Sequence, residues 1–115
     1  MWRLRPTVLI AALWAVTALR TVRRQLRAGS VNPTFRGPPR LPDGAELGVL
    51  AVLSRLSPTC LEGATVRRRW LAAHGQPRDI VIGVPPGGLG DAPAHAWVDG
   101  TDPRSAADYL ELYRL

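Results

Sequence analysis

The chain has 115 residues, enough for one compact domain with a modest core, and its 46% hydrophobic content excludes a wholly disordered protein. All 15 basic residues are arginine and the formal net charge is +6. Residues 1–40 hold eight arginines and no acid, whereas residues 41–115 hold seven arginines and nine acids. No helix-turn-helix, zinc or strand-borne aromatic pattern accompanies the arginines, so nucleic-acid binding is not expected.

Residues 7–27 are predicted to form a long helix, because they are rich in Ala and Leu, Pro6 suits a first turn and Gly29 ends the pattern. Apolar residues expected on its inner face recur at helical spacing: Val8, Leu9, Ala12, Val16 and Leu19. The uncharged run from Pro6 to Leu19 is shorter than the roughly 20 residues of a spanning helix. Arginines also follow it where a signal peptide would be cut. We therefore expect an amphipathic helix of a soluble protein that packs in the core, with docking on a membrane surface or a partner as the alternative.

Two further helices are predicted after an irregular connector. Residues 30–44 contain four prolines and two glycines, which favours an irregular surface segment. A helix over residues 45–56 follows, with apolar side chains that can face inward: Leu47, Leu50, Ala51 and Leu53. The next helix is expected to begin around Cys60 and to end before Gly75.

The periodicity then changes to that of short strands. Residues 79–84 are rich in β-branched side chains and residues 94–98 alternate small and large side chains, so both are predicted strands with a loop over 85–93 between them. Asp99-Gly100 is a two-residue hairpin signal and predicts a weak third strand at 101–104. A short closing helix is expected over 105–114, with Ser105 as its cap and Asp108 in its first turn.

Helices followed by a small antiparallel sheet define an α+β fold. We expect a single domain over residues 1–115. Its parts are an N-terminal helix (1–29), the connector (30–44) and a core that carries the chemistry (45–115).

Cys60 is the only cysteine, so the chain cannot form an internal disulfide or a multi-cysteine metal site, and no metal or other cofactor is expected. A thiol at a helix N-terminus is favoured in its reactive thiolate form. His95, on a following strand, can accept the proton if that strand packs beside the helix start. The pattern predicts a cysteine nucleophile with a histidine base, and an inert, buried cysteine is the alternative.

A carboxylate is needed to orient His95, and Asp102 is the first choice. In the predicted hairpin Trp97 pairs with Asp102, which places both on the same face as His95. Asp108 is the second choice, and Asp99 the third because it suits the turn itself. Asp102 as an ordinary turn residue remains the alternative. Trp97 is expected to form a wall of the substrate pocket beside His95.

Several segments together resemble a known family: Pro58-Thr59-Cys60-Leu61, Trp70-Leu71 with Gly75, Ile82-Gly83-Val84, Ala94-His95-Ala96-Trp97-Val98 and Tyr113-Arg114-Leu115. They resemble the transglutaminase-like cysteine peptidase of lasso-peptide biosynthesis, the B2 or leader-peptidase protein. The likeness covers about half of the chain closely and the whole chain loosely.

The resemblance implies a papain-like α+β core with a Cys-His-Asp triad. In this sequence Cys60 would be the nucleophile, His95 the base, and Asp102 the acid by its distance from the last residue. The seven-residue spacing from His95 to Asp102 is shorter than in the family.

Members of that family remove the leader from a ribosomally made precursor peptide. The resemblance therefore implies three partners: the precursor, a separate small recognition protein that grips the leader, and a macrocyclase that closes the ring on the freed amine. A single cysteine fits a reducing compartment, so a cytoplasmic location is expected.

Two other functions compete with peptide cleavage. One is a non-catalytic adaptor that docks through its basic N-terminal helix on a membrane or a partner protein. The other is transglutaminase chemistry, in which the same triad forms a cross-link and expels ammonia instead of adding water.

Overall fold

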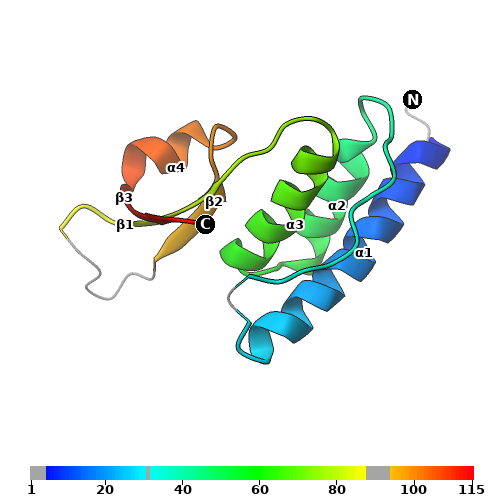
Figure 1. The fold of residues 1–115 in the computed structure, drawn as a ribbon. Coiled ribbons are helices and arrows are strands. Elements are labelled where there is room, and N and C mark those ends of the chain that lie inside the picture. Colours follow the sequence, from blue (N-terminus) through cyan, green and yellow to red (C-terminus); the bar gives the residue numbers. More distant parts are fainter. Residues whose placement is uncertain (1–4, 31, 88–93) are drawn as a thin grey trace.

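The structure is a computed structural model that describes residues 5–30, 32–87 and 94–115. Within these residues the chain forms helices and strands in the order α1 (Pro6–Arg27), α2 (Glu46–Leu56), α3 (Cys60–Ala73), β1 (Ile80–Val84), β2 (His95–Val98), α4 (Pro103–Asp108) and β3 (Leu110–Arg114). Helices α1, α2 and α3 lie together on one side of the molecule, and the sheet lies with α4 on the other (Figure 1). The predicted α+β class is confirmed.

Helix α1 packs into the core through a face that includes several alanines. Its buried residues are Ala11, Trp14, Ala15, Ala18, Leu19 and Val22. The predicted inner face was wrong except at Leu19, because Leu9 is 47% exposed and Val8, Ala12 and Val16 are only partly buried. The small side chains of α1 let α2 and α3 approach it closely. Trp14 is buried, and its indole N–H donates to the Arg36 carbonyl at 3.0 Å.

Among the described residues, α1 is the one helix long and apolar enough to cross a membrane by length and composition, and 33% of that stretch is buried. A core helix of a soluble protein and a signal sequence meet the same criteria. The packing of α1 against α2 and α3 agrees with the predicted role in the core.

Helix α2 lies against α1 through a glycine, which sets the rotation of the helix. A β-carbon at Gly48 would lie 2.9 Å from the backbone nitrogen of Ala12 and would also meet the Val8 carbonyl. Gly48 and Val49 are therefore buried, whereas Leu47 and Leu50 are 64% and 37% exposed. The predicted inward orientation was wrong for Leu47, Leu50 and Ala51, because close backbone approach outweighed the burial of larger side chains. Leu53 is partly buried and packs against the core.

Helix α3 begins at Cys60 because a capping box fixes its start. The Thr59 hydroxyl accepts from the Glu62 backbone N–H at 3.2 Å, and the Glu62 carboxylate accepts from the Thr59 N–H at 2.9 Å. The same carboxylate pairs with Arg23 of α1 at 3.1 Å. The helix ends at Ala73, and Gly75 follows with φ +79°.

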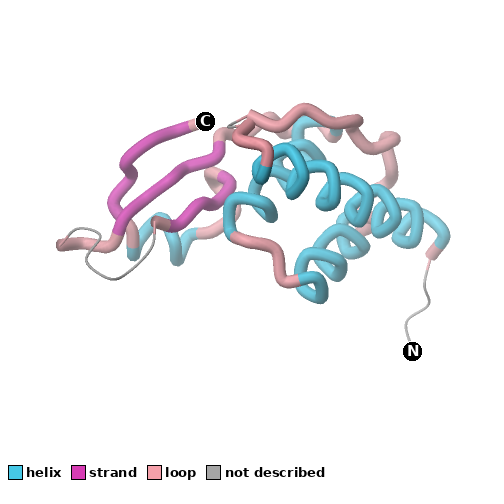
Figure 2. The backbone as a smooth tube through the Cα atoms, turned by 90° about the horizontal axis from the view of Figure 1, so that it is seen from below, coloured by secondary structure: helices cyan, strands magenta, loops and turns pink. Residues whose placement is uncertain are grey.

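The sheet has the antiparallel order β2-β1-β3, so β1 is the central strand. All three strands lie on the opposite side of the molecule from the three long helices (Figure 2). Ile80 pairs with Val98 and Gly83 with His95. The predicted loop over 85–93 is described only at 85–87, and its remainder lies outside the described residues.

The end of the chain differs from the prediction. The hairpin and the third strand at 101–104 were wrong, because Asp102 accepts from the Ser105 N–H at 3.0 Å and starts α4, with Pro103 in the first turn. A short closing helix does form, but it spans Pro103–Asp108 instead of 105–114, and Asp102 instead of Ser105 caps it. Helix α4 ends at Asp108, and residues 110–114 form β3 on the free edge of β1.

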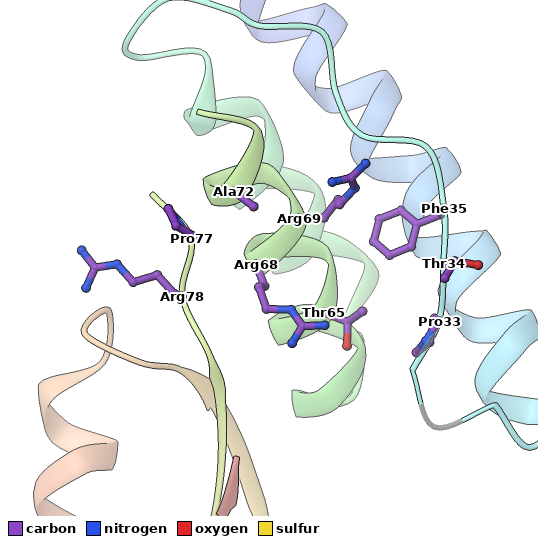
Figure 3. Close-up of a pocket in the computed structure, with 9 residues that line it drawn as sticks. All are labelled: Pro33, Thr34, Phe35, Thr65, Arg68, Arg69, Ala72, Pro77 and Arg78. Carbon is purple, nitrogen blue, oxygen red and sulfur yellow. The ribbon is translucent and has the colours of Figure 1, made fainter. Parts of the chain in front are cut away.

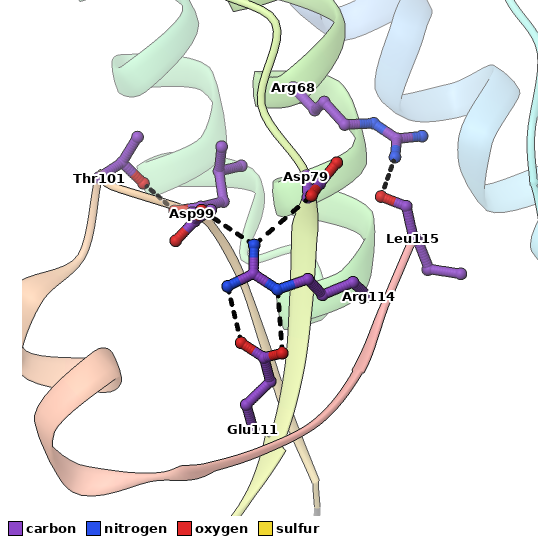
Figure 4. A network of polar contacts seen from close by, with 8 residues as sticks. Arg68, Asp79, Asp99, Thr101, Glu111, Arg114 and Leu115 are labelled. Carbon is purple, nitrogen blue, oxygen red and sulfur yellow. Dashed lines mark hydrogen bonds and ion pairs between the residues drawn. The ribbon is translucent and has the colours of Figure 1, made fainter.

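An exposed charge network anchors β3 to the ends of its neighbours (Figure 4). Arg114 pairs with Glu111 at 2.7 Å, with Asp99 at 3.0 Å and with Asp79 at 3.4 Å. The hydrogen bond from Arg114 lowers the pKa of Glu111, and the Glu111 and Asp99 contacts raise the pKa of Arg114. Both groups therefore stay charged over the whole neutral range, and the contacts of Arg114 with Asp79 and Asp99 add modest attraction between β3 and its neighbours that salt screens.

Candidate active site

The thiol of Cys60 lies at the contact between the helical side and the sheet. It is exposed, and its Sγ accepts a hydrogen bond from the backbone N–H of Ala96 in β2 at 3.4 Å. This contact places the sulfur beside the strand that carries His95.

One cavity of about 350 Å³ gathers the four residues singled out in the sequence: Cys60, His95, Trp97 and Asp102 all line it. Leu50 and Leu53 of α2 and Arg67 of α3 complete the walls. The fold therefore brings Cys60 and His95 to one place although 35 positions separate them in the sequence. Their catalytic roles remain a prediction.

The ring of His95 is half-buried and held from several sides. It stacks on Trp97 with ring centroids 5.7 Å apart and meets Tyr109 at 4.9 Å. Its Nε2 lies 2.9 Å from the hydroxyl oxygen of Ser105. Trp97 can pack this closely because Gly83 lacks a side chain, since a β-carbon there would lie 2.8 Å from the indole ring.

Ser105 stands between His95 and Asp102. Its hydroxyl donates to Asp102 Oδ2 at 2.6 Å, and the side chain is buried. Since a hydroxyl has one hydrogen, its oxygen must accept from His95 Nε2–H. In the neutral imidazole this hydrogen bond places the proton on Nε2, so Nδ1 is the nitrogen available to act as a base.

Asp102 acts on His95 through Ser105, which differs from the direct diagonal contact expected from a hairpin. The side-chain hydrogen bond from Ser105 lowers the pKa of the Asp102 carboxyl, and the backbone N–H of Ser105 and the charge of His95 lower it further. Because the folded pKa lies below the unfolded value, the ionised carboxylate stabilises the fold at neutral pH. That contribution is lost as the pH falls through the lowered pKa.

The two alternative acids lie elsewhere. Asp99 pairs with Arg114, and Asp108 is exposed at the end of α4 and does not line the cavity. The position of Ser105 and the packing of Tyr109 on His95 were not predicted. The run Asp102-Pro103-Arg104-Ser105 is a helix-start pattern, and it was the available signal for the Ser105 contact.

Within residues 5–30, 32–87 and 94–115, no group of three or more His, Cys, Asp or Glu side chains is arranged to hold a metal ion. The cavity offers a thiol, and beside it an imidazole that a serine hydroxyl links to a carboxylate.

The fold and the cavity define an α+β domain with a cysteine–histidine site. The family model of the Transglutaminase-like superfamily matches residues 7–114. The chain therefore belongs to the transglutaminase-like superfamily, which includes cysteine peptidases. Comparison with curated proteins and with solved structures found no match.

Proposed function

We propose that this protein is a cysteine peptidase that removes the leader from a ribosomally synthesised lasso precursor peptide. The observation that carries the proposal is the shared cavity, in which the thiol of Cys60 accepts from Ala96 N–H while Ser105 and Asp102 orient His95. The likeness of the Cys60 and His95 segments to leader peptidases supplies the substrate class.

The proposed reaction starts with attack of the Cys60 thiolate on the carbonyl carbon at the leader–core junction, with His95 holding the thiol proton. His95 then protonates the departing amine as the C–N bond breaks. Water, deprotonated by His95, hydrolyses the thioester and releases the leader carboxylate and the thiol. The Cys60 backbone N–H, as first residue of α3, makes no intrahelical bond and can stabilise the oxyanion.

The cavity walls suggest how a peptide is held. Trp97 lines the cavity but is only 6% exposed, so we assign it the positioning of His95 and an edge of the substrate wall. Leu50 supplies exposed apolar surface. Arg67 pairs with Glu46 at 3.3 Å through Nη2, while its Nε has no partner among the described residues.

The proposal includes the partners implied by the family likeness. The precursor would be presented by a separate leader-recognition protein, and a macrocyclase would use the freed amine, all in the cytoplasm. The exposed leucines of α1 and α2, Leu9, Leu13 and Leu47, give such proteins apolar surface to dock on.

The direct test is to mix this protein, the recognition protein and the precursor peptide encoded beside it, and to weigh the products. We expect two fragments whose masses sum to the precursor plus one water. Protein treated first with iodoacetamide is the control and should yield none. An intact precursor would favour the adaptor, and a product lighter by one ammonia would favour cross-linking.

Replacing Ser105 with alanine is expected to lower kcat about 10- to 100-fold, because His95 loses the acceptor that fixes its tautomer. The acidic limb of the pH–rate profile should move, which a change of folding alone would not cause. Ser105→Thr keeps the hydroxyl and should restore most of the activity. Unchanged kcat in Ser105→Ala would show that Ser105 does not position His95.

A further inference from the structure

Another face of α3 forms a second cavity, which we call the arginine groove. It has a volume of about 420 Å³ and lies between α3, the connector and the segment that leads into β1 (Figure 3). Arg68, Arg69 and Ala72 of α3 line it with Phe35 of the connector and Arg78. Arg68 and Arg69 precede Ala72 by four and three residues, so both neighbour it on one side of the helix.

The arginine groove is distinct from the candidate active site. The active-site cavity uses Cys60, Gly63, Ala64 and Arg67 of α3, and none of these lines the groove. The two cavities therefore open on different faces of the same helix, and occupation of the groove leaves the thiol of Cys60 accessible.

Among the described residues, no Asp or Glu side chain forms an ion pair with the arginines of the groove. Its lining holds three arginines and no carboxylate. Arg68 donates to a main-chain oxygen of Leu115, the last residue of the sequence, at 3.0 Å, and neither Arg69 nor Arg78 forms an ion pair within the described part of the chain. The carboxylate of Asp79, next to Arg78, is held by Arg114.

The guanidinium groups are positioned by their surroundings. Arg68 and Arg69 project from α3 into the space beside the connector, and Arg78 points outward from the far wall (Figure 3). The end of Arg69 rests on the connector backbone, since a β-carbon at Gly37 would lie 2.9 Å from its Nη2. Holding this side chain in place reduces the entropy lost when it binds a ligand.

We propose that the arginine groove binds an acidic segment of a polypeptide. The planar guanidinium fork matches a carboxylate, and Arg68 and Arg69 near Phe35 and Pro33 suit carboxylate heads on short aliphatic stems, while Arg78 adds positive charge at the far wall. The volume accommodates a few side chains. Its single aromatic ring does not form the stacking platform that single-stranded nucleic acids use.

The test uses fluorescein-labelled hexaglutamate and fluorescence anisotropy on the full chain. The variant Arg68→Gln/Arg69→Gln/Arg78→Gln is expected to bind about tenfold more weakly than the wild type. The charge-matched control is Arg20→Gln/Arg27→Gln/Arg55→Gln, whose three side chains are exposed and outside the groove. It should lose at most about threefold. Equal losses of affinity in the two triple variants would show attraction by net charge alone and would overturn the proposal. Absence of hexaglutamate binding by the wild type would overturn it as well.

A second pair of variants leaves every arginine in place. Ala72→Glu puts a carboxylate in the groove at an exposed helix position and should weaken hexaglutamate binding, whereas Ala51→Glu on exposed α2 surface should not. Hexaglutamine should not bind, and inorganic phosphate should compete only weakly. Tighter, groove-dependent binding of oligothymidine than of hexaglutamate would overturn the peptide assignment. Cys60→Ala should bind hexaglutamate normally. The test of the arginine groove is therefore independent of the test of peptidase activity.

Discussion

Changing Cys60 to alanine is expected to lower kcat/KM for precursor cleavage by about 10⁴-fold or more, because Cys60 is the only thiol of the chain and hydroxyls are much weaker nucleophiles at neutral pH. The fold should survive, since the thiol is exposed and its hydrogen bond to Ala96 N–H is a weak one. Thermal unfolding followed by circular dichroism should place the melting temperature close to that of the wild type. Normal cleavage by this variant would remove the nucleophile from the proposal.

The same thiol offers a check that needs no substrate. Because Cys60 is the only cysteine, the rate of iodoacetamide modification reports on this one sulfur. His95→Ala should slow the modification at neutral pH, since the imidazole no longer takes the proton. His74→Ala is the matched control, because that histidine stacks on Trp70 far from the cavity lining and should leave the rate unchanged. Equal rates in all three proteins would indicate an isolated thiol.

Gly48→Ala is expected to destabilise the protein by about 3 kcal/mol, which is unusual for a glycine inside a helix. The ordinary effect is a gain, because alanine has the higher helix propensity. Here the added carbon would meet the backbone of α1 at Ala12 and Val8, and backbone atoms cannot move aside as a flexible side chain can. The helices must separate and lose packing throughout the core.

The control for this variant is Gly63→Ala in α3. A β-carbon there would meet only Pro58 Cγ, at 3.6 Å, which is ordinary van der Waals contact. We expect it to stabilise the fold by about 0.5–1 kcal/mol. Urea unfolding should therefore move the two midpoints in opposite directions. A gain in stability from both variants would contradict the close approach of α1 and α2.

The sequence predicted helices and strands well where residues that favour the start or the end of an element stand at its boundaries. Pro6 and Gly29 bound α1, and Pro58-Thr59 ahead of Cys60 predicts the start of α3. The β-branched run at 80–84 predicts β1 because β-branched side chains favour strands. These features depend on neighbours in sequence, so one sequence was enough to find them.

Features that depend on distant parts of the chain were not predictable in the same way. The inner face of α2 follows from the contact of Gly48 with α1, and leucine spacing cannot reveal it. Strand β3 exists because β1 has a free edge, although its own residues are all exposed. The choice of Asp102 was made from a hairpin that does not form, yet the residue lies near His95 because α4 begins there.

The two members of the proposed pair come from different sides of the molecule, Cys60 from the helical layer and His95 from the sheet. Most of the far-ultraviolet helical signal arises in α1, α2 and α3, and that layer has its own buried contacts. Slight loosening of the sheet against α3 would therefore separate the proposed pair, and we expect precursor cleavage to stop before the ellipticity changes. Inactivation at denaturant concentrations below the spectroscopic midpoint is the natural behaviour of a site assembled across such a boundary.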